Sequence, residues 1–565
     1  MNANRRQFLI KSGAGIAGLL AAEVTSASLA LASGKPGADA NFPGLVPLPA
    51  HIRITRGKPF IVRPAMALDD SAARKVGGPA GAGLADYARR QLAARAGVHL
   101  DVVAPKTPAD IVLRLAHKPI CAGADWQVAQ AYHLDTAPDG RRVDITAGTL
   151  HGLFYGVVTL LNLVQKVGEH WQIPAVEITD WPRFQWRGYM LDVSRHFFGS
   201  HEVMQIIDIM ALLKLNIFHW HLTDHQGWRL SCKKYPRLTS VGAWRSDVGF
   251  GFPHAASTHY NARGQYGGFY THQDVRDVLA YAAQRHITIV PEIESPGHCA
   301  AAVAAYPWLS CSGKPITVPA GAYRPGLNKI IMCAGSPRVY QFMETVIGEV
   351  ADMFPGPYIH TGGDEVDYAS WQTCRRCAAL MRKRRLTTMP QLQQYYEARI
   401  ARLVAAAGKK MICWDFAPPG SLLMAWHGGA PQLAADAAQA KQQVIRCPQG
   451  HLYFDWLPTQ TSTQKVYQFD PTEPGFTPQT RPFLLGAQAN LWTEWVPNLD
   501  VVWQRTFPRL CAAAEVFWTP QDDRHWANFT GRLKGFKLAP PRRPRTGSTR
   551  KALGSASPPI PPKKS

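Results

Sequence analysis

The sequence predicts an α/β fold in which a (β/α)8 barrel follows a small α+β domain. Two observations predict the barrel. Beyond residue 182, short apolar segments recur eight times with helical stretches between most of them, as expected for such a barrel with insertions. Polar and aromatic residues follow many of these segments, at the strand ends where active sites of barrels form. The eight predicted strands are residues 189–193, 216–222, 287–293, 358–360, 410–414, 422–426, 443–446 and 483–491.

The preceding stretch, residues 41–180, has a mixed pattern. Alternating strands are predicted at 52–62, 109–115 and 141–147, and helices at 84–96 and 149–167. Pro182 marks the boundary, because proline resists continuing a helix or a strand. We therefore predict an N-terminal α+β accessory domain and assign residues 183–537 to the catalytic barrel.

The first 32 residues resemble a twin-arginine export signal. Arg5 and Arg6 precede a weakly apolar run, and Ala30-Leu31-Ala32 has the small residues of a cleavage site. The alternative is a membrane anchor, but the apolar run 13–22 has ten residues and a spanning helix needs roughly 20. We therefore predict an exported protein, periplasmic or secreted, with no membrane span in its mature form.

The net charge of +22 is unevenly distributed. Residues 539–565 contain seven Lys or Arg, no Asp or Glu and many prolines, which predicts a disordered basic tail. A tether to anionic surfaces is an alternative function for this tail. The charge is not accompanied by any nucleic-acid-binding motif, so we predict no nucleic acid partner.

Ten cysteines in 565 residues are too few for a disulfide scaffold. Cys374 and Cys377 form the one close pair, and without a second pair or a histidine at ligand spacing we do not predict zinc there. A disulfide among Cys299, Cys311 and Cys333 stays open. We predict neither a metal nor a cofactor for the reaction.

Asp364 and Glu365 are the leading candidates for chemistry. They follow an apolar strand and the pair Gly362-Gly363, which can turn the chain into a pocket. Two close carboxyls tend to separate into one that stays ionised and one whose pKa rises. A solvated acidic turn is the alternative, but other strand ends also carry polar or aromatic residues, namely Asp192, Arg195, Asp224, Glu294, His298, Trp414, Asp415, Trp426, Trp492 and Glu494.

Five motifs in order resemble glycoside hydrolase family 20, the β-N-acetylhexosaminidases. The resemblance extends from about residue 41 to 537. The motifs are RGYMLDVSRH at 187–196, HWHLTD at 219–224, PGH at 296–298, HTGGDE at 360–365 and GAQANLWTE at 486–494.

The resemblance implies a retaining exo-hydrolase that removes terminal non-reducing β-linked GlcNAc or GalNAc from oligosaccharides such as chitobiose or from glycoconjugates. In this family the substrate's own acetamido group is the nucleophile, so two separated carboxylates are not needed. Glu365 would be the general acid and then the base, with a raised pKa. Asp364 would stay ionised and steady the cyclised cation.

The resemblance also implies substrate contacts. Tyr453 would donate to the acetamide oxygen and Asp455 would contact sugar hydroxyls. Arg195 would bind the 3- and 4-hydroxyls, and Glu494 the 4- or 6-hydroxyl. The tryptophans would enclose the acetamido methyl and underlie the sugar ring, with core packing as the alternative for each of them, and they are Trp414, Trp426 and Trp492.

His298 and Asp224 resemble the family's relay that tunes the acid, although a lone histidine is more often a core residue. Two further functions are weighed. A non-catalytic amino-sugar-binding protein would be expected to lack Asp364 or Glu365. A metal-dependent barrel hydrolase would use His219 and His221, which project from the same face of a strand, but no third ligand is evident.

The chain departs from the family at two positions. His225 follows Asp224 where the family usually has a second Asp, and Glu294 stands where the family often has Asp. We expect altered pocket electrostatics, because an Asp-to-His change alters local charge by up to two units. The oligomeric state and the preference between GlcNAc and GalNAc are left open.

Overall fold

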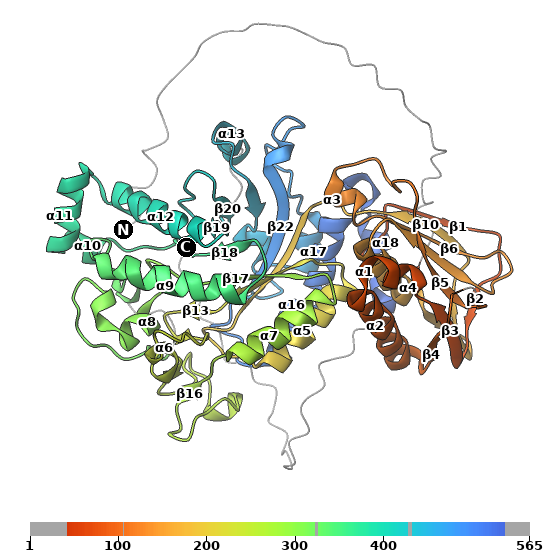
Figure 1. Cartoon of the computed structure of the whole chain (residues 1–565), viewed down its shortest axis with the longest axis horizontal. Coiled ribbons are helices and arrows are strands. Elements are labelled where there is room, and N and C mark those ends of the chain that lie inside the picture. The colour runs from red at the N-terminus through yellow and green to blue at the C-terminus, as the bar shows by residue number, and fades with distance from the viewer. Residues whose placement is uncertain (1–41, 106, 322–325, 428–431, 537–565) are drawn as a thin grey trace, which may run out of the picture.

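The computed structural model describes residues 42–105, 107–321, 326–427 and 432–536 (Figure 1). The predicted export signal and basic tail lie outside the described residues. In the part of the chain that is described, no helix combines the length and apolar character needed to cross a membrane.

Eight parallel strands close into a barrel, which confirms the predicted fold class. Each predicted strand overlaps one observed strand. In barrel order the strands are β11 (Trp186–Asp192), β12 (Ile217–His221), β17 (Thr288–Glu292), β18 (Tyr358–His360), β19 (Lys410–Cys413), β20 (Leu422–Ala425), β21 (Val444–Arg446) and β22 (Leu484–Leu491).

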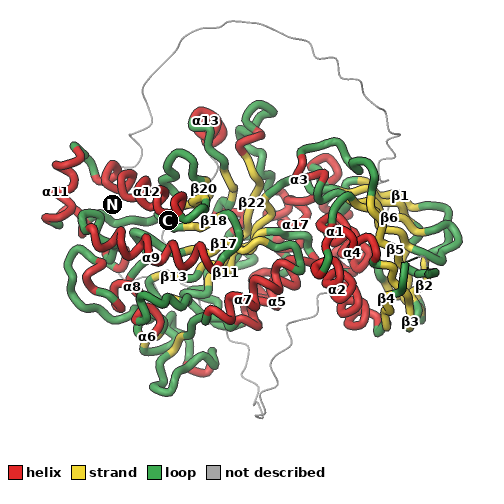
Figure 2. The backbone as a smooth tube through the Cα atoms, viewed as in Figure 1, coloured by secondary structure: helices red, strands yellow, loops and turns green. Residues whose placement is uncertain are grey.

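Helices cover the outside of the barrel (Figure 2). Residues 414–421, between β19 and β20, contain no helix. The longer helices that follow the other strands are α5 (Ser200–Leu212), α7 (His272–Ala283), α9 (Pro337–Met353), α11 (Arg375–Arg384), α12 (Met389–Ala406), α13 (Gln432–Gln439), α16 (Leu499–Thr506), α17 (Arg509–Trp518) and α18 (Trp526–Gly535).

The barrel interior has an apolar layer beneath a polar one. The apolar layer joins residues from several strands, namely Trp186, Ile217, Val290, Ile412, Trp414, Leu422, Met424, Ile445, Cys447 and Leu485. The polar layer lies nearer the carboxyl ends of β12, β17 and β18, and its buried side chains include His219, Glu292 and His360. The polar side chains thus lie at the end of the barrel where the sequence predicts the site.

The preceding domain is built on a seven-stranded sheet with helices on one side. The sheet order is β1 (His51–Ile54), β10 (Val176–Asp180), β6 (Tyr132–Thr136), β7 (Val143–Ala147), β5 (Ile111–Leu115), β3 (Ala65–Asp69) and β4 (His99–Val102). A smaller sheet contains β2 (Phe60–Val62), β9 (His170–Ile173) and β8 (Gln165–Val167). The main helices are α1 (Ser71–Gly77), α2 (Pro79–Ala96) and α4 (Leu150–Leu163), and they lie between the larger sheet and the barrel (Figures 1 and 2).

Two element predictions in this domain were wrong in detail. The strand predicted over 52–62 is two strands in different sheets, because Gly57 and Pro59 interrupt it. The helix predicted over 149–167 begins where expected, with the Thr149 hydroxyl accepting from the Gly152 amide, but it ends at Leu163. The chain then continues directly into β8.

A buried ion pair joins the two domains. Nζ of Lys214, just after α5, lies 2.8 Å from Oδ2 of Asp180 at the end of β10. The indole of Trp518 on α17 donates to Asp180 from the barrel side at 2.9 Å. Both charged side chains are almost completely buried, so the attraction acts in a low-dielectric environment.

Candidate active site

The loop after β18 carries the paired carboxyls. Gly362 has φ 72° and Gly363 has φ 96°, in the left-handed region that glycine adopts without steric cost. A Cβ atom on Gly362 would lie 1.6 Å from Oε2 of Glu294, so a side chain at this position has no room. The glycines let the chain pass close to the next loop and bring Asp364 and Glu365 to the carboxyl end of the barrel.

Asp364 and Glu365 differ strongly in burial. The side chain of Asp364 is 13% exposed and that of Glu365 is 49% exposed. Burial raises the pKa of Asp364 to about 7, helped by the charges of Glu365 and Asp415 and opposed by His298. We expected Glu365 to be the member whose surroundings raise its pKa and Asp364 to stay ionised. The expectation that Asp364 stays ionised was wrong, because its burial beneath Glu365 raises its pKa.

His298 links both carboxyls to Asp224. Its Nδ1 atom lies 3.2 Å from Oδ1 of Asp224, and its Nε2 atom lies 3.8 Å from Oδ2 of Asp364 and 3.6 Å from Oε2 of Glu365. Burial works against the charged imidazolium, but Asp224 and Asp364 outweigh it and raise the pKa of His298 to about 9. His298 is therefore a cation at neutral pH, and the core-histidine alternative does not describe it.

Glu292 organises the layer below the site, and sequence reasoning missed it. Its Oε1 atom accepts from the Trp414 indole at 2.7 Å and lies 2.8 Å from Nδ1 of His360. Its Oε2 atom lies 2.5 Å from Nδ1 of His221 and 2.9 Å from Nε2 of His219. The available signal was a carboxylate inside an apolar strand, in register with His221 on the preceding strand and with His360 on the following one.

These contacts bear on the metal-dependent alternative. His219, Glu292 and His360 approach closely enough to hold an ion. However, both ring nitrogens of His221 are engaged, one by Glu292 and the other by Asp224 at 3.1 Å, and Nδ1 of His219 contacts Gln488 at 2.9 Å. A metal bound at this group would have to displace the contacts that Glu292 makes with the three histidines.

Arg195 lies at the opposite side of Asp224 from His298. One terminal nitrogen lies 2.7 Å from Oδ2 of Asp224 and 4.0 Å from Oε1 of Glu494, and the other lies 3.2 Å from Oδ2 of Asp192. The guanidinium also lies over the Trp492 ring, 5.0 Å from its centroid. Three carboxylates and an aromatic face therefore fix the orientation of a planar donor group next to the pocket.

Aromatic rings from four loops form one wall. Trp414 is 2% exposed, and its ring centroid lies 5.9 Å from that of Trp492. Tyr453 lies 6.0 Å from Trp492 and 6.4 Å from Trp426, nearly parallel to the latter. The Trp426 indole donates to Asp415 at 3.0 Å. The predicted tryptophans and Tyr453 are thus brought together, although Trp414 also packs into the apolar layer of the barrel.

Asp455 belongs to the same wall. It lies two residues beyond Tyr453 and is 8% exposed. Burial raises the pKa of the Tyr453 phenol, and the negative charge of Asp455 adds to this effect. The phenol therefore stays protonated at neutral pH and can donate a hydrogen bond.

The surroundings of both departures from the family pattern disfavour the charged form of the side chain. Burial, together with the nearby cation His298, lowers the pKa of His225 to about 3. Burial, together with Asp364 and Glu292, raises the pKa of Glu294 well above its ordinary value. His225 is therefore neutral near pH 7, and the surroundings of Glu294 disfavour its charged form. The expected two-unit change in charge from an Asp-to-His replacement is instead about one unit.

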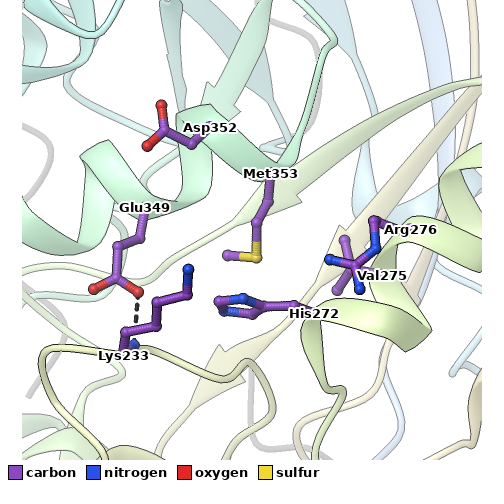
Figure 3. Close-up of a pocket in the computed structure, with 7 residues that line it drawn as sticks. All are labelled: Lys233, His272, Val275, Arg276, Glu349, Asp352 and Met353. Atoms are coloured by element: carbon purple, nitrogen blue, oxygen red, sulfur yellow. Dashed lines mark hydrogen bonds between the residues drawn. The ribbon is translucent and has the colours of Figure 1, made fainter.

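A separate surface pocket of about 260 Å³ lies between α7 and α9 (Figure 3). Its walls include Lys233, whose amide donates to Glu349 at 2.7 Å. The other lining residues are His272, Val275, Arg276, Asp352 and Met353. None of the predicted site residues lines it.

An eight-stranded barrel with paired carboxyls, a fixed arginine and an aromatic wall at its carboxyl end defines a glycoside hydrolase. The model for "Glycosyl hydrolase family 20, catalytic domain" matches residues 184–521, and the model for domain 2 of that family matches residues 43–181. The chain belongs to glycosyl hydrolase family 20.

Relatives of the chain support this assignment. A β-hexosaminidase of Porphyromonas gingivalis is 39% identical over 423 residues, which cover 70% of this chain and 52% of that protein. The chain thus matches about half of that relative's length. A β-N-acetylhexosaminidase of Cellulomonas fimi is 32% identical over 510 residues, covering 86% of this chain and 92% of the relative.

Solved structures have the same fold. The GH20 exo β-N-acetylglucosaminidase of Vibrio harveyi, in complex with N-acetylglucosamine, superposes with a TM-score of 0.75 at 28% identity over 88% of this chain and 77% of that one. The N-acetyl-β-hexosaminidase of Streptomyces plicatus gives 0.73 at 30% identity over 87% of this chain and 94% of that one.

Proposed function

We propose that this chain is a retaining exo-β-N-acetylhexosaminidase that removes terminal non-reducing β-linked GlcNAc or GalNAc. The names of its relatives support the activity. One observation carries the proposal furthest. Asp364 and Glu365 approach the same nitrogen of His298, yet Glu365 faces the solvent and Asp364 lies beneath it. One carboxyl can therefore reach a glycosidic oxygen while its neighbour meets the acetamido group of the same sugar.

In the first step, the acetamido carbonyl oxygen of the substrate attacks the anomeric carbon. The glycosidic C–O bond breaks, and Glu365 gives its proton to the departing oxygen. The sugar is left as a cyclic oxazolinium ion, because the new bond joins its own amide oxygen to the anomeric carbon.

In the second step, water attacks the anomeric carbon and reopens the ring. The bonding electrons return to the amide, and Glu365, now a carboxylate, accepts the proton from water. Two successive inversions retain the β configuration. Glu365 thus ends the cycle in its starting protonation state.

Asp364 would act as the carboxylate partner of the acetamide. Its pKa of about 7 leaves a mixture of ionised and protonated forms near neutrality. An acetamide N–H that donates to the carboxylate favours its ionised form, and the positive charge of the oxazolinium favours it further. The cost of burying Asp364 is thus offset mainly after the sugar binds and most in the charged intermediate.

Arg195 and Glu494 would bind the sugar hydroxyls, as the resemblance implies, and Asp455 would contribute a further contact. Tyr453 would donate to the acetamide oxygen from the aromatic wall. The three tryptophans of this wall would receive the acetamido methyl and the apolar face of the ring.

The decisive test compares nitrophenyl β-GlcNAc with nitrophenyl β-glucoside. We expect hydrolysis of the first and not of the second, because glucose has no acetamido nucleophile. Glu365→Gln should lower kcat by roughly 10² to 10⁴, whereas Glu177→Gln on the accessory sheet should leave it unchanged. Equal turnover of the glucoside would refute substrate assistance, and binding of GlcNAc without any turnover would favour the sugar-binding alternative.

We also propose that the protein is exported and acts outside the cytoplasm on oligosaccharides or glycoconjugates that end in N-acetylhexosamine. The paired arginines and the small-residue cleavage site in the first 32 residues support export. Fractionation of cells that express the chain, with Arg5 and Arg6 both replaced by Lys as the comparison, tests this proposal. Retention of the unaltered protein in the cytoplasm would contradict it.

A further inference from the structure

Four of the ten cysteines converge at one place outside the active site. They are Cys311, Cys333, Cys374 and Cys377, and their Sγ atoms all lie within 4.8 Å of one another. Three of the four are buried and Cys311 is partly exposed. The cluster lies between the loop that follows β17 and the loop that follows β18, with Cys374 directly before α11, on the side of the barrel away from the accessory domain (Figure 1).

The sulfur distances fit a shared centre better than two bonded pairs. Cys333 lies 3.7 Å from Cys374 and 3.8 Å from Cys377, and Cys377 lies 3.9 Å from Cys311. Four sulfurs placed at about 2.3 Å from a tetrahedral zinc ion are separated by about 3.8 Å. A disulfide requires about 2.05 Å and selects one partner for each sulfur, but here Cys333 and Cys377 each contact two others.

The backbone at Gly335 packs closely against the Cys374-x-x-Cys377 turn. A Cβ atom on Gly335 would lie 2.3 Å from the carbonyl carbon of Arg376 and 2.5 Å from the amide nitrogen of Cys377. Cys374 occupies the N-cap position of α11, where the helix dipole favours negative charge. The guanidinium of Arg376 donates to the carbonyl of Cys311 at 3.2 Å, which holds positive charge next to the sulfurs.

We propose that these four cysteines bind a structural zinc ion as thiolates. Sequence reasoning rejected zinc at Cys374 and Cys377 because no second pair was evident. The missing ligands come from Cys333, 41 residues before Cys374, and Cys311, 66 residues before Cys377. Neither of these two cysteines has another cysteine within a few residues in the sequence, so no spacing motif identifies them as ligands. Binding releases the thiol protons to solvent and leaves the oxidation state of zinc and sulfur unchanged.

The ion would hold together two loops that reach the active site. The Trp371 indole donates to the carbonyl of Met332 at 2.8 Å, and the Ser370 hydroxyl donates to the carbonyl of Lys329 at 2.5 Å. From the same strip of chain, Asn328 donates to Oε2 of Glu365 at 3.4 Å. Zinc would therefore act as a positioning element for the residues behind Glu365 without contacting substrate, a consequence that rests on the proposed function.

Metal analysis of the full-length protein tests the site directly. We expect about one zinc per chain after purification with zinc supplied and excess removed. Cys374→Ser combined with Cys377→Ser should lose that zinc, whereas Cys232→Ser, a buried cysteine outside the cluster, should retain it. Zinc content of the double variant equal to that of the unaltered protein would overturn the proposal, because the ion would then lie elsewhere.

Two measurements on the unaltered chain keep the test independent of whether variants fold. Cobalt substitution should give the ligand-field and sulfur-to-cobalt charge-transfer bands of a four-thiolate tetrahedral site. Peptide mapping without reduction should find no disulfide among the four cysteines. Absence of the cobalt bands, or recovery of the cysteines as two disulfides, would contradict a zinc site.

The outcome is separable from that of the proposed function. Hydrolysis of nitrophenyl β-GlcNAc tests the reaction, and zinc content tests the site. With a structural ion, removal of zinc should lower the midpoint of thermal unfolding and reduce kcat, while the pH dependence of kcat/KM keeps its shape. A changed pH profile after removal would place the ion in the reaction and overturn its structural role.

Discussion

Nδ1 of His298 lies 3.2 Å from Oδ1 of Asp224, and this contact sets the charge of the whole site. Asp224 is itself buried, but Arg195 and His298 hold the pKa of its carboxyl well below the ordinary value. The permanent negative charge keeps His298 protonated, so a cation stands beside Asp364 and Glu365 at neutral pH. The pH dependence of activity follows from this arrangement.

We predict that His298→Gln moves the acid limb of kcat/KM to higher pH. Activity rises with pH as Asp364 ionises, near pH 7 in the unaltered protein. Loss of a neighbouring cation disfavours the carboxylate and raises the pKa of Asp364 further. Rates on nitrophenyl β-GlcNAc across the pH range measure the shift. His99→Gln, at an exposed position of the accessory sheet, should leave the profile in place. A limb that stays still or moves to lower pH in His298→Gln would exclude this coupling.

Asp415→Asn should move the same limb in the opposite direction. The charge of Asp415 raises the pKa of Asp364, and an amide at this position removes that repulsion. Asparagine still offers an oxygen to the Trp426 indole, so the aromatic wall keeps its anchor. The same pH series measures the shift. If His298→Gln and Asp415→Asn shift the limb in the same direction, Asp364 is not the group that titrates.

Glu292→Gln should destabilise the fold by roughly 3–5 kcal/mol, the usual cost of leaving a buried charge without its partner. His221 is the partner at risk, because Glu292 and Asp224 overcome its burial and raise its pKa to about 10. Urea unfolding at neutral pH measures the change. The same substitution at Glu177, which pairs with Arg53 at the surface, should cost less than about 1 kcal/mol. Similar losses for the two variants would show that Glu292 does not hold the layer together.

Arg195→Lys should lower kcat/KM roughly 10- to 100-fold, the equivalent of losing one charged hydrogen bond of about 1.5–3 kcal/mol. A lysine ammonium cannot contact Asp192 and Asp224 at once in the orientation that the planar guanidinium maintains. Steady-state kinetics on nitrophenyl β-GlcNAc give the value. Arg89→Lys, which alters an exposed ion pair on α2, supplies the matched control. Equal kinetics for the two variants would remove Arg195 from the binding site.

The recurrence of eight apolar segments along the chain was sufficient to predict the barrel. Each of the eight apolar segments overlaps an observed strand, because strands of a parallel barrel are buried on both faces and read as continuous apolar runs. The polar residues after those strands marked Asp224, His298, Asp364 and Arg195, which the structure brings together. Their family roles remain predictions.

The features that were missed depend on distances between chain segments. Glu292 lies within an apolar strand, and only its contacts with His219 and His221 on the neighbouring strand show that two histidines face it. The unequal burial of Asp364 and Glu365 depends on how the loop after β18 folds back. The identities of two adjacent residues do not predict that conformation. The cysteine cluster likewise needs the loops after β17 and β18 to meet.

The ion pair between Lys214 and Asp180 has a consequence for modular exchange of the accessory domain. Separating the halves between residues 180 and 184 would expose the facing surfaces of both domains and leave Lys214 without its carboxylate, with Trp518 losing its acceptor at the same time. Each half would therefore lose polar contacts that are buried in the intact chain. Recombination that transplants the barrel alone into another protein must either carry Asp180 along or replace Lys214 with a neutral residue.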